Sequence, residues 1–212
     1  YGGIFDTGEK ATAVRYDYLP NDLLKNKVVQ DILGDGSLLE VAQEYLGTTP
    51  KSDVLSMWWH TNYSDKPDSL AAQFFHFDMD RIKWLKIFIY LTDVNKENGP
   101  HCFVSGSHKS HAIPREMLKK GYVRISDEEV NQSFKSQDLI SFEGKAGTLI
   151  IEDTRGLHKG AHVIGEPRLI LQLQFSNSLF GTNYEKQRMT EVVSTKLKEQ
   201  LSKNPDIYSE YM

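Results

Sequence analysis

Two histidines, one aspartate and one arginine are the residues of this chain whose types and spacing best suit a chemical role. His76 and Asp78 are separated by one residue, and His158 follows 82 residues after His76. Two imidazoles and one carboxylate can hold ferrous iron on one face and leave the opposite positions open for oxygen and a co-substrate. Arg168 comes ten residues after His158, and a guanidinium is suited to bidentate binding of a carboxylate. The set favours an iron oxygenase.

Strands are the elements that must position these side chains. Side chains at i and i+2 of a strand point to the same face, so His76 and Asp78 can reach one ion while Phe77 turns away into packing. His158 is expected just after a strand at 147–151 and the turn that follows it. Arg168 begins the next strand, at the head of a partly polar face. We therefore expect a sheet to bring the four residues together.

Extended runs dominate from about residue 54 onward and predict a mainly β (α+β) core. These runs are 54–60, 73–78, 84–92, 147–151 and 168–175. Short strands separated by turns, with helices grouped at the ends of the chain, favour an antiparallel double-sheet barrel with a helical outer layer.

The domain organisation follows from the same patterns. A chain of 212 residues is expected to form a single domain, 1–212. Helical spacing predicts helices within about 20–47 and again at about 185–203, on either side of a β core at about 54–180. Within that core, the segment 113–143 is a candidate lid or insertion. It carries a capping box at Ser126 and Glu129.

Composition excludes several classes of function. A net charge of −4 and a pI near 6.0 give no basic field for nucleic acid, and no apolar run approaches the length that spans a bilayer. Cys102 is the only cysteine, so no internal disulfide can form. The chain opens with Tyr1 and shows no charged-then-apolar leader, so a cytoplasmic location is expected.

Each site residue has a simpler interpretation when it is taken alone. His158 is equally consistent with a hydrogen-bonded core histidine. Arg168 alone is better explained as a surface arginine that pairs with Glu166. The order of the residues along the chain, their strand context and the ten-residue interval together favour the site.

Other polar and aromatic residues offer weaker signals. The segment 105–109 has the composition of a phosphate loop but lacks its spacing, so we interpret it as a tight turn. A small packed cysteine is the better explanation of Cys102, since no acid partner or activating helix start is evident. Three histidines form a loose cluster that favours surface-loop positions over a second metal site, and three strand residues are candidates for the floor of the pocket. The first set is His101, His108 and His111, and the second is Trp58, Trp59 and His60.

An ordered set of motifs across residues 74–175 resembles the phytanoyl-CoA dioxygenase family. The resemblance implies a double-stranded β-helix fold (jelly-roll, cupin-like) and an oxygenase that uses iron(II) with 2-oxoglutarate as co-substrate. The matching runs are Phe75-His76-Phe77-Asp78, residues 88–94, Glu97-Asn98-Gly99-Pro100, residues 105–109, residues 147–149 and residues 153–158.

The resemblance also implies roles for individual residues. His76, Asp78 and His158 would ligate the iron, and Arg168 would anchor the distal carboxylate of 2-oxoglutarate. Two further residues that the resemblance assigns to the co-substrate pocket are Trp58 and Thr92. Many members carry a small hydroxyl residue two positions after the arginine or near the distal histidine, whereas this chain has Ile170 and Gly160.

The ligand set also indicates which reaction to expect. Three protein ligands leave two positions for the 2-oxo acid and one for dioxygen, and the expected products are succinate, carbon dioxide and a hydroxylated small molecule. Retention of Asp78 favours hydroxylation over halogenation, because related halogenases replace this carboxylate. Two other functions stay open: a catalytically silent jelly-roll binding protein, and a zinc hydrolase on the same ligands.

Overall fold

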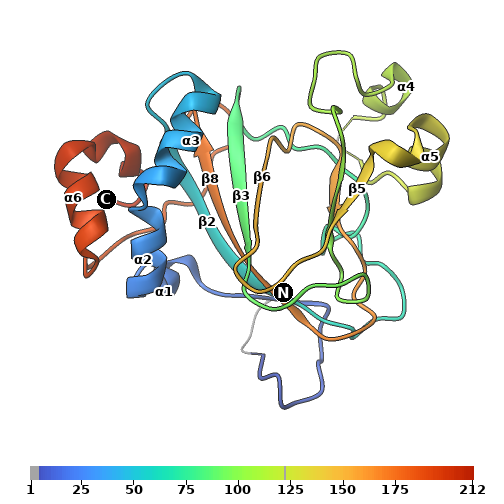
Figure 1. Ribbon diagram of the computed structural model, residues 1–212, viewed down its shortest axis with the longest axis horizontal. Coiled ribbons are helices and arrows are strands. Elements are labelled where there is room, and N and C mark those ends of the chain that lie inside the picture. The colour runs from blue at the N-terminus through green and yellow to red at the C-terminus, as the bar shows by residue number, and fades with distance from the viewer. Residues whose placement is uncertain (1–4, 122) are drawn as a thin grey trace. The chain divides into compact units, whose positions relative to one another are not determined.

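The computed structural model describes residues 5–121 and 123–212 (Figure 1). The first residue, Tyr1, on which the expected location partly depends, lies outside this range. Among the described residues, none of the helices has the length and apolar character needed to cross a membrane. The chain divides into two compact units, so the single domain expected from chain length stays a prediction.

The strands form a five-stranded and a three-stranded sheet. The first has the order β1-β2-β8-β3-β6 and the second the order β5-β4-β7. The strands of the first sheet are β1 (Arg15–Asp17), β2 (Lys51–His60), β3 (Trp84–Tyr90), β6 (Leu149–Glu152) and β8 (Arg168–Ser176). Those of the second are β4 (His101–Val104), β5 (Leu139–Phe142) and β7 (His158–Gly160).

One unit contains Tyr18–Met57, Met79–Phe88 and Leu171–Met212 and holds most of the helices. They are α1 (Pro20–Leu23), α2 (Lys27–Leu33), α3 (Gly36–Leu46), α6 (Thr195–Lys203) and the 3-10 helix η2 (Pro205–Tyr208). Asn26 caps α2 and Asp35 caps α3, each by accepting hydrogen bonds from two backbone N–H groups. Helices α2 and α6 lie side by side (Figure 1), and Gly34 allows this because a Cβ there would lie 2.5 Å from the backbone nitrogen of Leu197.

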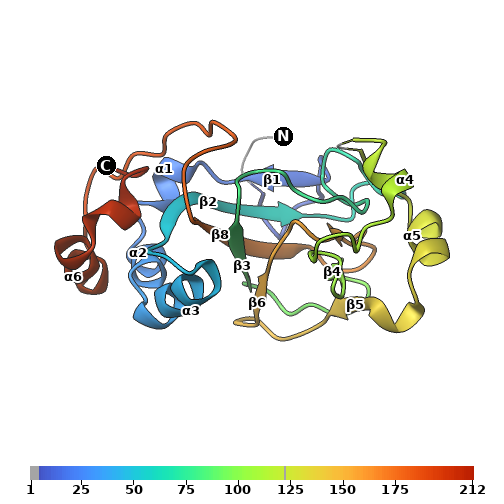
Figure 2. The ribbon, with the colours of Figure 1, turned by 90° about the horizontal axis from the view of Figure 1, so that it is seen from above.

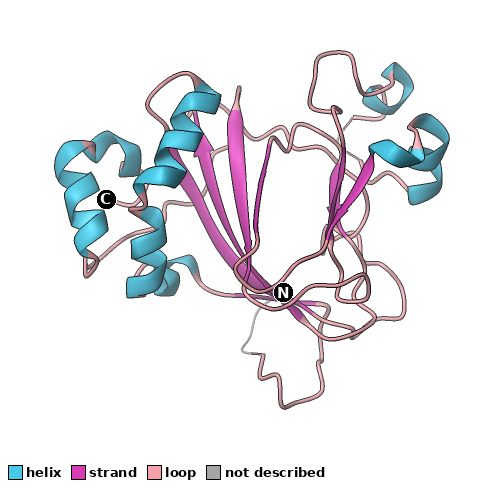
Figure 3. Cartoon of the chain, viewed as in Figure 1, coloured by secondary structure: helices cyan, strands magenta, loops and turns pink. Residues whose placement is uncertain are grey.

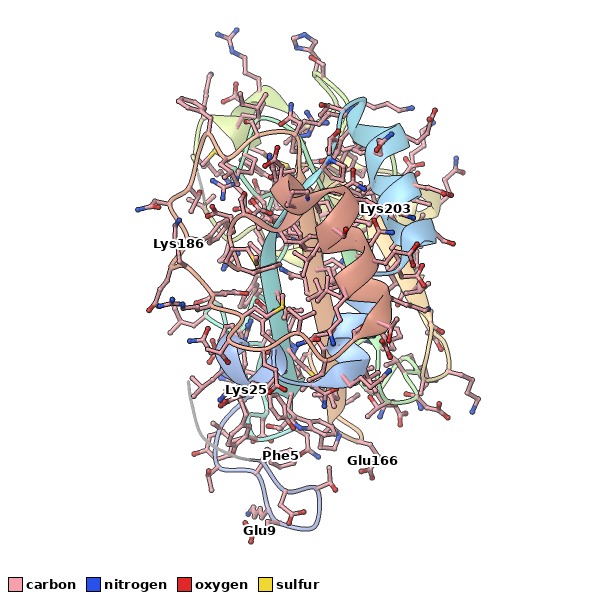
Figure 4. The ribbon with its side chains drawn as sticks, turned by 90° about the vertical axis from the view of Figure 1, so that its left-hand side faces the viewer. Phe5, Glu9, Lys25, Glu166, Lys186 and Lys203 are labelled. Carbon is pink, nitrogen blue, oxygen red and sulfur yellow. The ribbon has the colours of Figure 1, made fainter. Side chains whose placement is uncertain are left out.

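The predicted carboxyl-terminal helix at about 185–203 is wrong in its first half. Helix α6 begins only at Thr195, and Lys186 lies on the irregular segment that precedes it (Figure 4). The Gln30 side chain accepts hydrogen bonds from the backbone N–H groups of Val193 and Ser194, and the Ser194 hydroxyl then caps the helix. A long-range side-chain contact therefore delays the start of the helix.

The other unit contains Trp58–Asp78, Ile89–Ile170 and the described part of the first 17 residues, and it holds the whole three-stranded sheet. Strand β4 pairs antiparallel with β5 on one side and with β7 on the other. Helices α4 (Arg115–Leu118) and α5 (Asp127–Ser133) lie near β4 and β5 (Figure 2). The core cluster of this unit consists of Phe75, Phe77, Val104, Ile113, Met117, Ile125, Val130 and Leu157.

The segment 113–143 contains α4, α5, the 3-10 helix η1 (Ser136–Asp138) and β5. Ser126 caps α5 by accepting a hydrogen bond from the Glu129 backbone N–H at 3.2 Å. Four residues of the segment belong to the core cluster, so this part of the segment contributes to the hydrophobic core of its unit. Its action as a lid stays a prediction.

The expected strand at 73–78 is absent, because only isolated bridges join this stretch to its neighbours. Figure 3 distinguishes the strands from the loops and turns of the chain. Phe75 pairs with Ile125 and His76 pairs with His158, both antiparallel. The Asp78 backbone N–H donates to the Thr154 carbonyl at 2.8 Å. The backbone is thus fixed at three separate points, without a continuous ladder.

The turn at 104–107 holds the chain that leads into β7. The buried Ser107 hydroxyl donates to the Val104 carbonyl at 2.7 Å and accepts from the Leu157 backbone N–H at 2.7 Å. Gly156 lies against it, since a Cβ there would be 2.7 Å from the Ser107 hydroxyl oxygen. This hydroxyl therefore fixes the residue before His158.

We expect Ser107→Ala to lower the free energy of unfolding by about 1–3 kcal/mol, because it leaves the Leu157 N–H buried without an acceptor. The matched control is Ser105→Ala in the same turn, where the exposed side chain should change it by less than about 0.5 kcal/mol. Urea unfolding of both variants tests this. Equal effects would show that the Ser107 hydroxyl does not fix the turn.

Candidate active site

A reciprocal pair of backbone hydrogen bonds brings His76 and His158 together. The His76 N–H donates to the His158 carbonyl at 3.0 Å, and the His158 N–H donates to the His76 carbonyl at 2.9 Å. In such an antiparallel pair the two side chains lie on the same face. Their ring centroids are 4.2 Å apart, and Asp78, two residues further along an extended backbone, points to the same side.

The three side chains form a cluster with the dimensions of a metal site. The distances to the Asp78 carboxylate oxygens are 3.9 Å from His76 Nε2 and 3.6 Å from His158 Nε2. Two ligand atoms that are each about 2.1 Å from one ion lie at most about 4.2 Å apart, so both distances fit a shared ion. All three residues are buried, and all three ligand atoms lie within 4.8 Å of one another.

Backbone carbonyls fix the orientation of both imidazoles. Nδ1 of His76 lies 3.0 Å from the Phe74 carbonyl oxygen, and Nδ1 of His158 lies 3.0 Å from the Gly156 carbonyl oxygen. A carbonyl oxygen only accepts, so each Nδ1 carries the proton and each Nε2 presents a lone pair. Metal-binding histidines are commonly held in this way. The donor set therefore fits a divalent ion such as Fe(II).

Burial keeps both histidines in the neutral form that a metal requires. Burial lowers the pKa of His76 well below its ordinary value, and the neighbouring His158 lowers it further, against the opposing effect of Asp78. Burial likewise lowers the pKa of His158, although Asp78 and Glu152 oppose it. The charge of Arg124 also lowers the pKa of His76, so the segment 113–143 brings a cation near the cluster.

Arg168 is almost completely buried, with 1% of its surface exposed, which excludes the surface pairing with Glu166. Its guanidinium donates to the Gly99 carbonyl oxygen and, at 2.7 Å, to Nδ1 of His60. Among the described residues no carboxylate forms an ion pair with it. Because a buried charge without a counter-charge is costly, the guanidinium is suited to an anionic ligand.

The metal cluster and Arg168 are neighbours along β7. His158 begins this strand and Gly160 ends it. A Cβ on Gly160 would lie 3.0 Å from a terminal guanidinium nitrogen of Arg168. Two residues of a strand span about 6.6 Å, a length suited to a five-carbon dicarboxylate.

Trp58 and Thr92 are linked to the arginine through its neighbours. The Trp58 ring is 6.1 Å from the ring of His60, edge to face, and its Nε1 is buried with no hydrogen-bond partner in the described chain. The Thr92 hydroxyl accepts from the backbone N–H of Leu169, the residue after Arg168. Roles for both in co-substrate binding stay predictions.

His101 and Glu152 form a buried pair beside the cluster that the sequence did not indicate. His101 Nε2 lies 2.7 Å from a Glu152 carboxylate oxygen, and the His101 ring stacks on His158 at 5.8 Å. The expected surface-loop position of His101 is wrong, because it lies in β4 opposite Gly160 with 4% of its surface exposed. One available signal was Glu152 itself, a charged residue two positions after Ile150 in a short apolar strand.

The remaining weak signals do not form a second site in the part of the chain that is described. Among residues 5–121 and 123–212, His76, Asp78 and His158 form the one group that could hold a metal ion, and His111 is exposed. Burial raises the pKa of the Cys102 thiol, which agrees with a packed and unreactive cysteine.

Solved structures with the same fold bind metal and 2-oxoglutarate. HygX from Streptomyces hygroscopicus with nickel, 2-oxoglutarate and hygromycin B bound has a TM-score of 0.56 at 16% identity, over 82% of this chain and 73% of that one. The iron-bound form of HygX has a TM-score of 0.56 at 18% identity, over 88% and 83%. EctD from S. alaskensis with 2-oxoglutarate and 5-hydroxyectoine has a TM-score of 0.51 at 19% identity, over 77% and 56%. A search of curated protein sequences gave no match.

These likenesses confirm the predicted fold class, a mainly β double-stranded β-helix of the jelly-roll type. The solved structures with this fold hold nickel or iron and 2-oxoglutarate, and His76, Asp78 and His158 of this chain form a group that could hold a metal ion. The family model for phytanoyl-CoA dioxygenase (PhyH) matches residues 6–166, and the chain belongs to this family. The predictions of the family, the enzyme class and the cofactors are thereby confirmed.

We expect the metal-free protein to lose stability as the pH falls from about 7.5 to about 5.5. His76 and His158 have folded pKa values below those of the unfolded chain, so below about pH 6.5 the unfolded state binds protons that the folded state does not. Each contributes at most about 1.4 kcal/mol per pH unit. Urea unfolding across this range should show the loss, and His158→Gln should reduce its slope. If the free energy of unfolding depends on pH equally in the variant and the natural protein, His158 is not a source of the pH dependence.

Proposed function

We propose that this protein hydroxylates a small molecule, with His76, Asp78 and His158 as iron ligands and Arg168 as the anchor for the distal carboxylate of 2-oxoglutarate. When bound, the metal and co-substrate supply oxidative decarboxylation of 2-oxoglutarate to succinate and carbon dioxide, coupled to hydroxylation of a C–H bond by dioxygen. No nucleic acid or membrane partner is proposed. A cytoplasmic location stays a prediction.

One combination of observations carries this proposal. Two buried imidazoles present Nε2 lone pairs beside a carboxylate, and a buried guanidinium without a carboxylate partner in the described residues lies at the other end of β7. The first group is suited to a divalent metal, and the second to an organic anion. A short dicarboxylate that binds the metal through its 2-oxo acid end matches both at once.

The residues of the chain contribute binding, orientation and exclusion of water. The carbonyl groups of Phe74 and Gly156 hold the protons of the two histidines on Nδ1, so that Nε2 stays available. His101 lies opposite Gly160 in the sheet, stacks on His158 and is held by Glu152. Burial of the whole group strengthens its electrostatic interactions with a charged co-substrate.

The segment 113–143 is proposed to cover the prime substrate. Ile125 pairs with Phe75, next to His76, and this supports a position beside the metal ligands. Loops that lie over a rigid scaffold often select the substrate. We therefore expect differences in substrate preference within the family to map to this segment.

We expect the iron-loaded protein to form succinate from 2-oxoglutarate and oxygen, and His76→Ala to reduce this at least about 100-fold because a metal ligand is lost. The control is His111→Asn, an exposed residue at φ 65° where asparagine is tolerated, which should keep the activity. Succinate and oxygen uptake are measured together, with a metabolite screen read by the mass gain of one oxygen.

Two outcomes would contradict the proposal, and each favours a different alternative. Binding of 2-oxoglutarate without turnover favours a silent binding protein. Activity that needs zinc but neither oxygen nor 2-oxoglutarate favours a hydrolase.

A further inference from the structure

The hydrogen-bond partners of the Arg168 guanidinium are neutral groups. One terminal nitrogen donates to the Gly99 carbonyl oxygen, and the other donates at 2.7 Å to Nδ1 of His60. The Tyr90 hydroxyl also interacts with the guanidinium. None of these partners carries a formal negative charge, so the positive charge of Arg168 is fixed in place but not cancelled.

The hydrogen bond from Arg168 also determines the state of His60. A guanidinium can only donate, so Nδ1 of His60 must accept, and the imidazole is neutral with its proton on Nε2. Burial lowers the pKa of His60 well below its ordinary value, and the charges of Arg168 and Arg15 lower it further. His60 therefore remains a neutral acceptor in the folded protein.

Neighbouring elements hold His60 in this position. Arg15 in β1 pairs with His60 in β2, and the Arg15 guanidinium lies over the Trp58 ring at 4.4 Å. The Trp58 ring meets the His60 ring edge to face, and the backbone of Ala71 lies close to the imidazole. With only 2% of its surface exposed, His60 has little freedom to rotate.

Glycine at position 160 fits closely against the same pair. A Cβ there would lie 3.0 Å from the guanidinium nitrogen that donates to His60, and 3.6 Å from the His60 ring. A larger side chain at this position would crowd this pair. The polar partner of the arginine on this side thus comes from β2, through His60.

We propose that His60 is a positioning residue for 2-oxoglutarate: it orients Arg168 toward the distal carboxylate without neutralising its charge. The inference rests on the proposed function, because it concerns the same co-substrate. An acidic residue at position 60 would orient the guanidinium equally well but would cancel the charge that binds the ligand. Charge and orientation can thus be separated by substitution.

The test compares His60→Gln with His60→Glu, which have nearly the same shape. Binding is measured by calorimetry on the nickel-loaded protein with 2-oxoglutarate and with 2-oxopentanoate, which lacks the distal carboxylate. We expect His60→Gln, a neutral acceptor, to bind 2-oxoglutarate within about threefold of the natural protein, and His60→Glu to bind it at least about tenfold more weakly. Affinity for 2-oxopentanoate should stay within about threefold in both.

A structural role alone would give a different pattern. Equal weakening of both ligands, or no difference between the two variants, would overturn the inference. As a check that needs no substitution, nitrogen NMR of histidine in the natural protein should show His60 protonated on Nε2, and a proton on Nδ1 would also overturn it. If the natural protein binds neither metal nor 2-oxoglutarate, the proposed function fails as well, and the two failures are thus distinguishable.

Discussion

The two reciprocal backbone hydrogen bonds between His76 and His158 are the contact on which the rest of the site depends. They join residues that are 82 positions apart, and they set the separation of the two imidazole rings. Since side chains alternate along an extended backbone, a slip of one residue would turn one imidazole away from the other. The packing of Phe75 and Leu157 in the core cluster, on the positions just before the two histidines, therefore protects the register.

The grouping of His76 and Asp78 on one face could be predicted because its evidence is local. Alternation between i and i+2 holds for any extended backbone, so His76 and Asp78 share a face even though the expected strand at 73–78 is only a series of bridges. The roles of His60 and His101 depend on contacts with residues 108 and 51 positions away, which no local pattern records. The same reason explains the late start of α6, which depends on a bond from Gln30.

The two ends of the proposed site differ in charge. At one end Asp78 contributes one negative charge to a buried and otherwise neutral ligand set, and at the other Arg168 contributes one positive charge among neutral partners. A doubly positive metal and a doubly negative 2-oxo diacid add no net charge to these residues. Binding both thus places opposite charges next to each end, whereas binding one alone leaves an excess in a buried space. This favours joint occupancy.

The uncompensated guanidinium of Arg168 also bears on how long the protein persists in a cell. A ligand that binds only the folded state reduces the fraction of molecules that unfold, and unfolded molecules are the ones that proteases degrade. Because the buried charge lacks a counter-ion among the described side chains, its natural anion contributes more to folding than it would at an exposed arginine. Under the proposed function, the supply of 2-oxoglutarate would therefore affect the folded fraction of this chain as well as its reaction rate.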